Sequence, residues 1–132
     1  MCVLIVDDQE IIRDSFSLLI ESLLKPNCID EASNGEEALE MVAKKHYDYI
    51  FMDISMPIMN GITATQKIMS KKKNADLKIL GVSMHTNQDD IESMKKAGAR
   101  GYLVKDKIGE HLEWAIDLMS SNAPFFIINF NN

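Results

Sequence analysis

Five short apolar runs alternate with stretches of helical periodicity, and this alternation is what most constrains the fold of the chain. The runs cover residues 2–6, 28–30, 49–52, 79–82 and 102–104. Most contain β-branched or aromatic residues, as is typical of strands buried on both faces. A strand followed by a helix, five times over, predicts an α/β fold with a parallel sheet covered by helices on both faces.

The intervening stretches carry apolar residues at helical spacing. In the first, Ile12, Phe16, Leu19 and Leu23 share one face, and Pro26 must end the helix. The second helix is expected to begin at Asn34, which forms a capping box with Glu37. The third is expected to run from Asn60 to about Met69 and the fourth from 88 to 97. The fifth is expected to begin at Asp106.

Length and charge limit the class of protein. A chain of 132 residues suits one domain, and 20 acidic against 14 basic residues give a net charge of −6. That surplus argues against nucleic acid or an anionic membrane as a direct partner. Cys2 and Cys28 lack a Cys-x-x-Cys spacing, and no apolar stretch approaches the roughly 18 residues of a membrane span. We therefore expect free thiols in a small cytoplasmic domain.

The last ten residues depart from the pattern. We expect the domain to cover residues 1–122 and an apolar tail to cover 123–132, because Pro124 breaks the last helix and residues 125–130 are mostly apolar. We interpret the tail as packed on the body or as a remnant of truncation. An added edge strand or a self-association segment is the alternative, because an exposed apolar segment invites strand pairing.

Polar side chains follow the predicted strands where each one ends. They are Asp7, Asp8, Asp53, Ser83 and Lys105. Taken singly, such residues are usually helix caps, turn residues or solvated charges, and Asp8 could start the first helix. In open parallel sheets, however, ligands bind outside the carboxyl ends of the strands. The joint placement therefore favours a pocket.

Three carboxylates in one pocket require a cation. Without one, their repulsion would force a proton onto one of them. Mg²⁺ suits a site of carboxylates, waters and a phosphate oxygen, and a carboxylate beside it can become an aspartyl phosphate. Lys105 and Ser83 are the right chemical types to hold the phosphoryl oxygens.

Four segments carry a family resemblance: residues 3–8, 34–39, 53–61 (Asp-Ile-Ser-Met-Pro-Ile-Met-Asn-Gly) and 98–106. From about Cys2 to Ser121 the chain resembles the receiver domain of two-component response regulators, and its end is similar to receivers of the LuxR-type subfamily. The resemblance implies a (βα)5 doubly wound, five-stranded parallel sheet with the flavodoxin-like strand order 2-1-3-4-5.

Position by position, the resemblance implies that Asp53 accepts a phosphoryl group from a phosphohistidine of a sensor histidine kinase or phosphotransfer protein. Asp8, Asp53 and the backbone carbonyl of Ser55 would bind Mg²⁺, with Asp7 acting through water. Lys105 would pair with the phosphate. The domain would catalyse only its own phosphorylation and dephosphorylation, and so would not be an enzyme in the usual sense.

The resemblance also implies a switch. Ser83 would turn to the phosphoryl group and Tyr102 would move inward, shifting the face formed by the fourth helix, fifth strand and fifth helix. That face would control a downstream partner or form a homodimer, for which the tail is a second candidate surface. Ser55 and His85 would tune the lifetime of the phosphoryl group.

Two departures and three alternatives accompany this interpretation. Asp106 follows Lys105 where many receivers have proline, and an apolar tail stands where the subfamily continues to a helix-turn-helix, so we expect no DNA binding by this chain.

A flavodoxin-type cofactor binder would need a phosphate-cradling loop in place of Asp7-Asp8-Gln9-Glu10. A hydrolase with an aspartate nucleophile would need a substrate cap. An interaction module that is never phosphorylated would be expected to lack Asp53 or Lys105.

Overall fold

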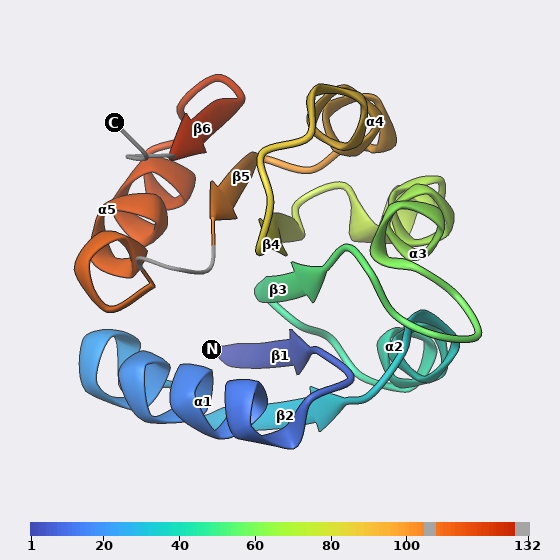
Figure 1. Ribbon diagram of the computed structural model, residues 1–132. Coiled ribbons are helices and arrows are strands. Elements are labelled where there is room, and N and C mark those ends of the chain that lie inside the picture. Colours follow the sequence, from blue (N-terminus) through green and yellow to red (C-terminus); the bar gives the residue numbers. More distant parts are fainter. Residues whose placement is uncertain (105–107, 129–132) are drawn as a thin grey trace.

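The computed structural model describes residues 1–104 and 108–128, in which strands and helices alternate (Figure 1). The elements are β1 (Cys2–Val6), α1 (Glu10–Leu24), β2 (Cys28–Ala32), α2 (Gly35–Lys44), β3 (Tyr49–Asp53), α3 (Gly61–Met69), a 3-10 turn η1 (Lys72–Asn74), β4 (Lys78–Ser83), α4 (Gln88–Ala97), β5 (Gly101–Val104), α5 (Ile108–Ser120) and β6 (Phe126–Ile128).

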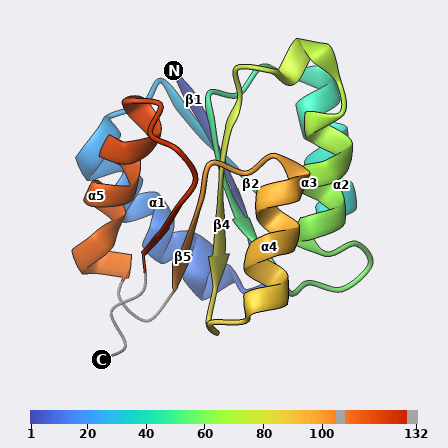
Figure 2. The same ribbon diagram turned by 90° about the horizontal axis from the view of Figure 1, so that it is seen from above.

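The strands form one parallel sheet in the order β2-β1-β3-β4-β5-β6. Helices α1 and α5 cover one face and α2, α3 and α4 the other, as both ribbon views show (Figures 1 and 2). The predicted α/β class and the order 2-1-3-4-5 are confirmed. The predicted count of five strands is wrong, because part of the apolar tail forms a sixth strand beside β5.

Side-chain alternation along the strands builds the two halves of the core. Val3 and Ile5 of β1 pack with α1 and α5, whereas Leu4 and Val6 pack in the cluster on the other face. All four are at most 1% exposed. Strands buried on both faces can be apolar at every position, which explains the continuous runs in the sequence.

The helix ends follow the cap residues. Asn34 and Asn60 accept backbone N–H bonds at the starts of α2 and α3, and Gly98 ends α4 in the left-handed region with φ 108°. Helix α1 instead has Gln9 at its N-cap position, so Asp8 does not start it. Asp106, the predicted cap of the fifth helix, lies outside the described residues.

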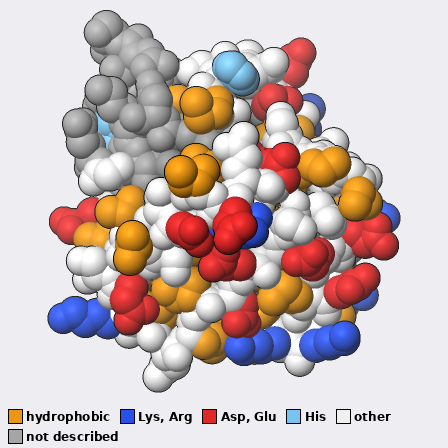
Figure 3. All heavy atoms as spheres, turned by 60° about the horizontal axis from the view of Figure 1, so that its bottom comes forward, with side chains coloured by type: hydrophobic (Ala, Val, Ile, Leu, Met, Phe, Trp, Pro, Cys, Tyr) orange, Lys and Arg blue, Asp and Glu red, His pale blue; other side chains and the backbone are white. Residues whose placement is uncertain are grey.

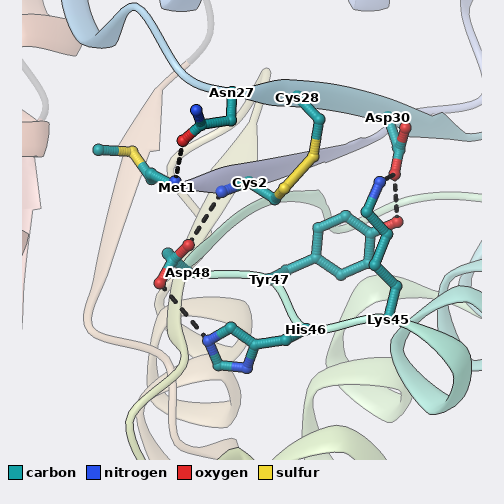
Figure 4. The surroundings of a disulfide bond; sticks show 9 residues. All are labelled: Met1, Cys2, Asn27, Cys28, Asp30, Lys45, His46, Tyr47 and Asp48. Atoms are coloured by element: carbon teal, nitrogen blue, oxygen red, sulfur yellow. Dashed lines mark hydrogen bonds and ion pairs between the residues drawn. A yellow bond between two sulfur atoms is a disulfide. The ribbon is translucent and has the colours of Figure 1, made fainter.

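The expectation of free thiols is wrong, because Cys2 and Cys28 form a disulfide (Figure 4). The two residues are the first of β1 and β2 and are direct partners in the parallel register, with Cα atoms 4.8 Å apart. Only the strand pairing brings them together, since they lie 26 positions apart in the sequence. The prediction of a reducing compartment rested on free thiols, and the disulfide removes that basis. The cytoplasmic location stays a prediction.

Polar contacts surround the disulfide (Figure 4). The N–H of Cys2 donates to Asp48 Oδ2 at 2.9 Å, and Asp30 accepts from Lys45 Nζ at 2.8 Å and from the Tyr47 hydroxyl at 2.5 Å. The hydrogen bond from Lys45, followed by that from Tyr47, lowers the pKa of the Asp30 carboxyl. The bonds to Asp30 fasten the edge strand β2, and the bond from Cys2 fastens β1, to the connection between α2 and β3.

Reduction of this disulfide is expected to lower the free energy of unfolding by about 3 kcal/mol, because the bond closes a loop of 26 residues in the unfolded chain. Urea unfolding with and without dithiothreitol measures the difference. The Cys28→Ser variant is the control, and its midpoint should match that of the reduced wild type and ignore the reductant. Equal midpoints for oxidised and reduced wild type would contradict a stabilising bond.

The surface sorts its charges unevenly. On the face drawn in Figure 3, one group of acidic side chains lies near the centre and others are spread out to the rim, where most of the Lys and Arg side chains also lie, with hydrophobic side chains scattered between them. Scattered apolar side chains are ordinary for a folded surface. Among the described residues, no helix combines the length and apolar character needed to cross a membrane.

Candidate functional site

Three carboxylates meet at the carboxyl edge of the sheet. Asp7 follows β1, Asp8 is next in the chain, and Asp53 ends β3; one carboxylate oxygen of each lies within 4.8 Å of the others. Asp7 and Asp53 are 2% and 5% exposed, whereas Asp8 is exposed. The structure thus brings together the acids that the strand-end argument selected.

Strand pairing and one arginine position these acids. Val6 is the register partner of Met52, so the residues that follow each strand reach the same edge. The Asp7 carboxylate accepts from the N–H of Gln9 at 2.9 Å, and Arg13 Nη1 donates to the Asp7 carbonyl at 2.7 Å. Sequence reasoning missed Arg13, since an arginine in a first helical turn is ordinarily a solvated charge.

The donor set fits Mg²⁺. Hard divalent ions prefer oxygen ligands, and the group Asp7, Asp8 and Asp53 offers three carboxylates within 4.8 Å of one another. The exposed Asp8 leaves one side of this cluster open to solvent and to incoming ligands. These residues could therefore hold the ion.

A cavity of about 180 Å³ lies against the carboxylates. Its lining residues are Asp8, Gln9, Asp53, Ser55, Ser83, Met84 and His85. Ser83 is the last residue of β4, which pairs with β3, and this pairing carries its hydroxyl to the same edge. The structure therefore assembles five of the predicted residues, Asp8, Asp53, Ser55, Ser83 and His85, around one space.

The loop after Asp53 is held against the end of β3 by backbone hydrogen bonds. Ile54 N–H donates to Val82 O at 3.2 Å and Gly61 N–H donates to Ile54 O at 2.9 Å. A Cβ on Gly61 would lie 2.0 Å from the carbonyl oxygen of Asp53. Glycine is therefore required here by space, because the loop closes directly onto the backbone of Asp53.

Tyr102 connects β5 to the edge of this cavity. Its ring is fully buried and its hydroxyl donates to the backbone carbonyl of His85 at 2.9 Å, while the His85 N–H donates to Ser83 Oγ at 3.2 Å. Burial raises the pKa of the Tyr102 phenol, and a hydrogen bond with Ser83 opposes that rise. The Tyr102 ring is therefore buried in this structure, and the inward movement expected of it on phosphorylation stays a prediction.

Lys105, predicted to pair with the phosphate, lies outside the described residues. So do Asp106 and residues 129–132 of the tail.

The comparisons with known proteins agree with this geometry. A family model described as the response regulator receiver domain matches residues 3–117. The response regulator UvrY of Escherichia coli (strain K12) is 35% identical over 123 residues, covering 93% of this chain and 56% of its own length. The nitrate/nitrite response regulator protein NarL of the same strain is 34% identical over 110 residues, covering 83% and 50%.

Solved structures with the same fold include a two-component response regulator of the LuxR family from Aurantimonas sp. SI85-9A1, with a TM-score of 0.81 at 28% identity, covering 94% of this chain and 87% of that one. The chemotaxis response regulator CheY4 of Vibrio cholerae has a TM-score of 0.80 at 28% identity, covering 89% and 97%.

The chain spans about half the length of the curated relatives that it matches. It aligns with LuxR-family regulators over nearly all of its own length, and its three-acid edge lies where the resemblance expects it. This chain belongs to the response regulator receiver domain family of two-component systems, a family of signalling domains.

Proposed function

We propose that this receiver accepts a phosphoryl group on Asp53 in a Mg²⁺-dependent reaction. The observation that carries the proposal is the position of Asp53, whose buried carboxylate lies within 4.8 Å of Asp7 and Asp8 and lines a cavity shared with Ser83. An oxygen of Asp53 attacks the phosphorus of a phosphohistidine. The P–N bond breaks, and its electron pair returns to the histidine nitrogen.

The other residues act on charge and orientation. Bound Mg²⁺ would supply the positive charge that offsets the repulsion among three adjacent carboxylates and that balances the phosphoryl oxygens. Asp8 and Asp53 would hold the ion with the Ser55 carbonyl, and Asp7 would act through water. Ser83 would donate its hydroxyl to a phosphoryl oxygen and Lys105 would pair with another. Ser55 and His85, both at the cavity, would control access of water to the phosphoryl group.

The readout would pass through Ser83 and Tyr102. Because the His85 backbone bonds to both side chains, a turn of Ser83 toward a phosphoryl group would alter the support of the Tyr102 hydroxyl. Tyr102 belongs to β5, so the change would reach α4, β5 and α5. The partners are a sensor histidine kinase or phosphotransfer protein and a downstream protein or second copy of the chain.

The size of the cavity bears on the alternatives. At about 180 Å³ it is smaller than the roughly 300–1,000 Å³ of sites for drug-sized ligands and cofactors. A phosphoryl group and a metal ion require much less room than a flavin or nucleotide. The cavity and its carboxylates therefore favour phosphoryl acceptance over a flavodoxin-type cofactor site.

The experiment is incubation with a small-molecule phosphodonor, such as acetyl phosphate, followed by intact mass spectrometry. With Mg²⁺ the wild type should gain one phosphoryl group, and with EDTA it should gain none. An unchanged mass in Mg²⁺, for protein that is folded by circular dichroism, would contradict the proposal and favour an interaction module that is not phosphorylated.

Metal binding is expected to stabilise the fold. At a Mg²⁺ concentration about ten times the Kd, the free energy of unfolding should rise by about 1.4 kcal/mol, because the ion binds the three carboxylates gathered in the folded state and not the unfolded chain. Thermal unfolding across a Mg²⁺ titration measures this gain. Asp8→Asn should shift the titration to at least about tenfold higher Mg²⁺. Asp14→Asn, on the exposed side of α1, should leave it unchanged.

A further inference from the structure

The last described segment of the chain is seated on the outer edge of β5. Strand β6 runs parallel to β5 with Gly101 opposite Phe126, Tyr102 opposite Ile127 and Leu103 opposite Ile128. In the ribbon views it lies beside β5, next to α5 and on the side of the sheet edge that faces away from β4 (Figures 1 and 2). The edge of β5 is therefore already paired.

The side chains of this segment alternate between the two faces of the sheet. Phe126 and Ile128 pack in the cluster with α5, and Ile128 is 2% exposed. Phe125 packs against the cluster on the opposite face, where Lys95 Nζ of α4 lies 5.9 Å from its ring centroid. Ile127 points outward and is 48% exposed. The segment thus bridges α4 and α5 across the end of the sheet.

Strand β5 carries a matching recess. A Cβ on Gly101 would lie 2.5 Å from Cε2 and Cζ of Phe126, so the absence of a side chain at Gly101 makes room for this ring. The turn that leads to β6 is also fastened, since Arg100 Nη1 donates to Asn122 Oδ1 at 3.1 Å and Ala123 N–H donates to Leu118 O at 3.1 Å. The recess and the turn both fit this particular segment.

We propose that the β5 edge is a strand-accepting groove between α4 and α5 and that residues 125–128 of the same chain are its resident ligand. Recognition takes the form of β-augmentation, with main-chain pairing to β5 and an aromatic side chain over Gly101. Because the segment is tethered by a short turn, its effective concentration is on the order of millimolar or more, so a second chain competes poorly for the groove.

This occupancy has a consequence for output, and that consequence rests on the proposed function. If α4, β5 and α5 form the output face, β6 covers part of it. A partner that uses the β5 edge must then displace residues 125–128 or dock against them. The inference of the groove does not require phosphorylation, because it rests on the pairing of β5 with β6.

Adjacent residues of β6 provide a matched pair of variants for the test. Phe126→Asp places a charge against the recess, whereas Ile127→Asp places the same charge on the exposed side. The probe is a fluorescein-labelled synthetic peptide of residues 122–132, added to the full-length proteins and followed by fluorescence anisotropy. We expect the peptide to bind Phe126→Asp at least about tenfold more tightly than wild type or Ile127→Asp, in which the groove is filled in cis.

Equal peptide binding by all three proteins, or no binding by folded Phe126→Asp, would overturn the proposal.

Hydrogen exchange on the unmodified protein gives a second test that needs no variant. Phe126 N–H donates to the Arg100 carbonyl, and in a parallel ladder the next amide directed at β5 is that of Ile128. These two amides should exchange at least about 100-fold more slowly than in the free peptide, and exchange at the free-peptide rate would contradict resident pairing. Phosphoryl uptake by Phe126→Asp is measured separately. It shows whether the phosphoryl-acceptor proposal holds when the groove proposal fails, and whether the groove proposal holds when phosphoryl uptake fails.

Discussion

Replacing Asp53 with asparagine is expected to abolish phosphoryl uptake from a small-molecule donor in Mg²⁺. The amide is nearly isosteric with the carboxylate but is not a comparable nucleophile, and it removes one of the three negative charges of the metal cluster. Asp53 is 5% exposed at the end of β3, so the substitution changes one buried position and little of the protein surface. We therefore attribute the expected loss of phosphoryl uptake to the missing carboxylate. Intact mass spectrometry should show no phosphorylated species.

The matched control is Asp14→Asn, the same chemical change on the exposed surface of α1. It should gain one phosphoryl group at the wild-type rate. The expectation fails if Asp53→Asn gains the same mass as wild type, since the acceptor would then be another residue.

A Cβ at position 61 is expected to have the largest effect on stability. Gly61→Ala would put a carbon 2.0 Å from the Asp53 carbonyl oxygen and 2.9 Å from the Met52 side chain, contacts that only a backbone shift can relieve. We expect a loss of about 4 kcal/mol in the free energy of unfolding, at the upper end for single substitutions. The shift would also move Asp53, so Mg²⁺ should stabilise the variant less than it stabilises wild type.

Gly109→Ala is the matched control for this substitution. Gly109 is exposed on α5, and a Cβ there would meet none of the described residues within 4 Å. Alanine also leaves the unfolded chain less backbone freedom than glycine, so this variant should be at least as stable as wild type. Urea unfolding compares the two variants, and similar midpoints for both would contradict the packing argument at Gly61.

The sequence predicts the fold well where apolar patterning and cap residues agree. The bounds of β1 and α4 match their predicted ranges, because a short buried run and an Asn–Gly pair of helix ends mark them clearly. Strand β2 extends to Ala32, two residues further than predicted. Asp30 and Glu31 belong to β2, which is an edge strand of the sheet, so their polar side chains can reach solvent. The run of apolar residues that marks a buried strand is therefore short here.

Long-range pairing is what the sequence leaves open. The register that sets Cys2 opposite Cys28 follows from the sheet and has no signature in their spacing. The same holds for β6, whose three residues pair with β5 where Gly101 leaves room for Phe126. The grouping of the site residues was easier to predict than these pairings. Asp7, Asp53 and Ser83 end or follow strands, and parallel pairing brings such residues to one edge of the sheet.

Chemical location of the phosphoryl group is the most direct test of the account. Wild-type protein phosphorylated in Mg²⁺ would be treated with borohydride, which reduces an aspartyl phosphate to homoserine, and then digested and sequenced by tandem mass spectrometry. The account predicts homoserine at position 53 and unmodified Asp7 and Asp8. Homoserine at either of those two positions, or a phosphoryl group retained on Ser83, would contradict it.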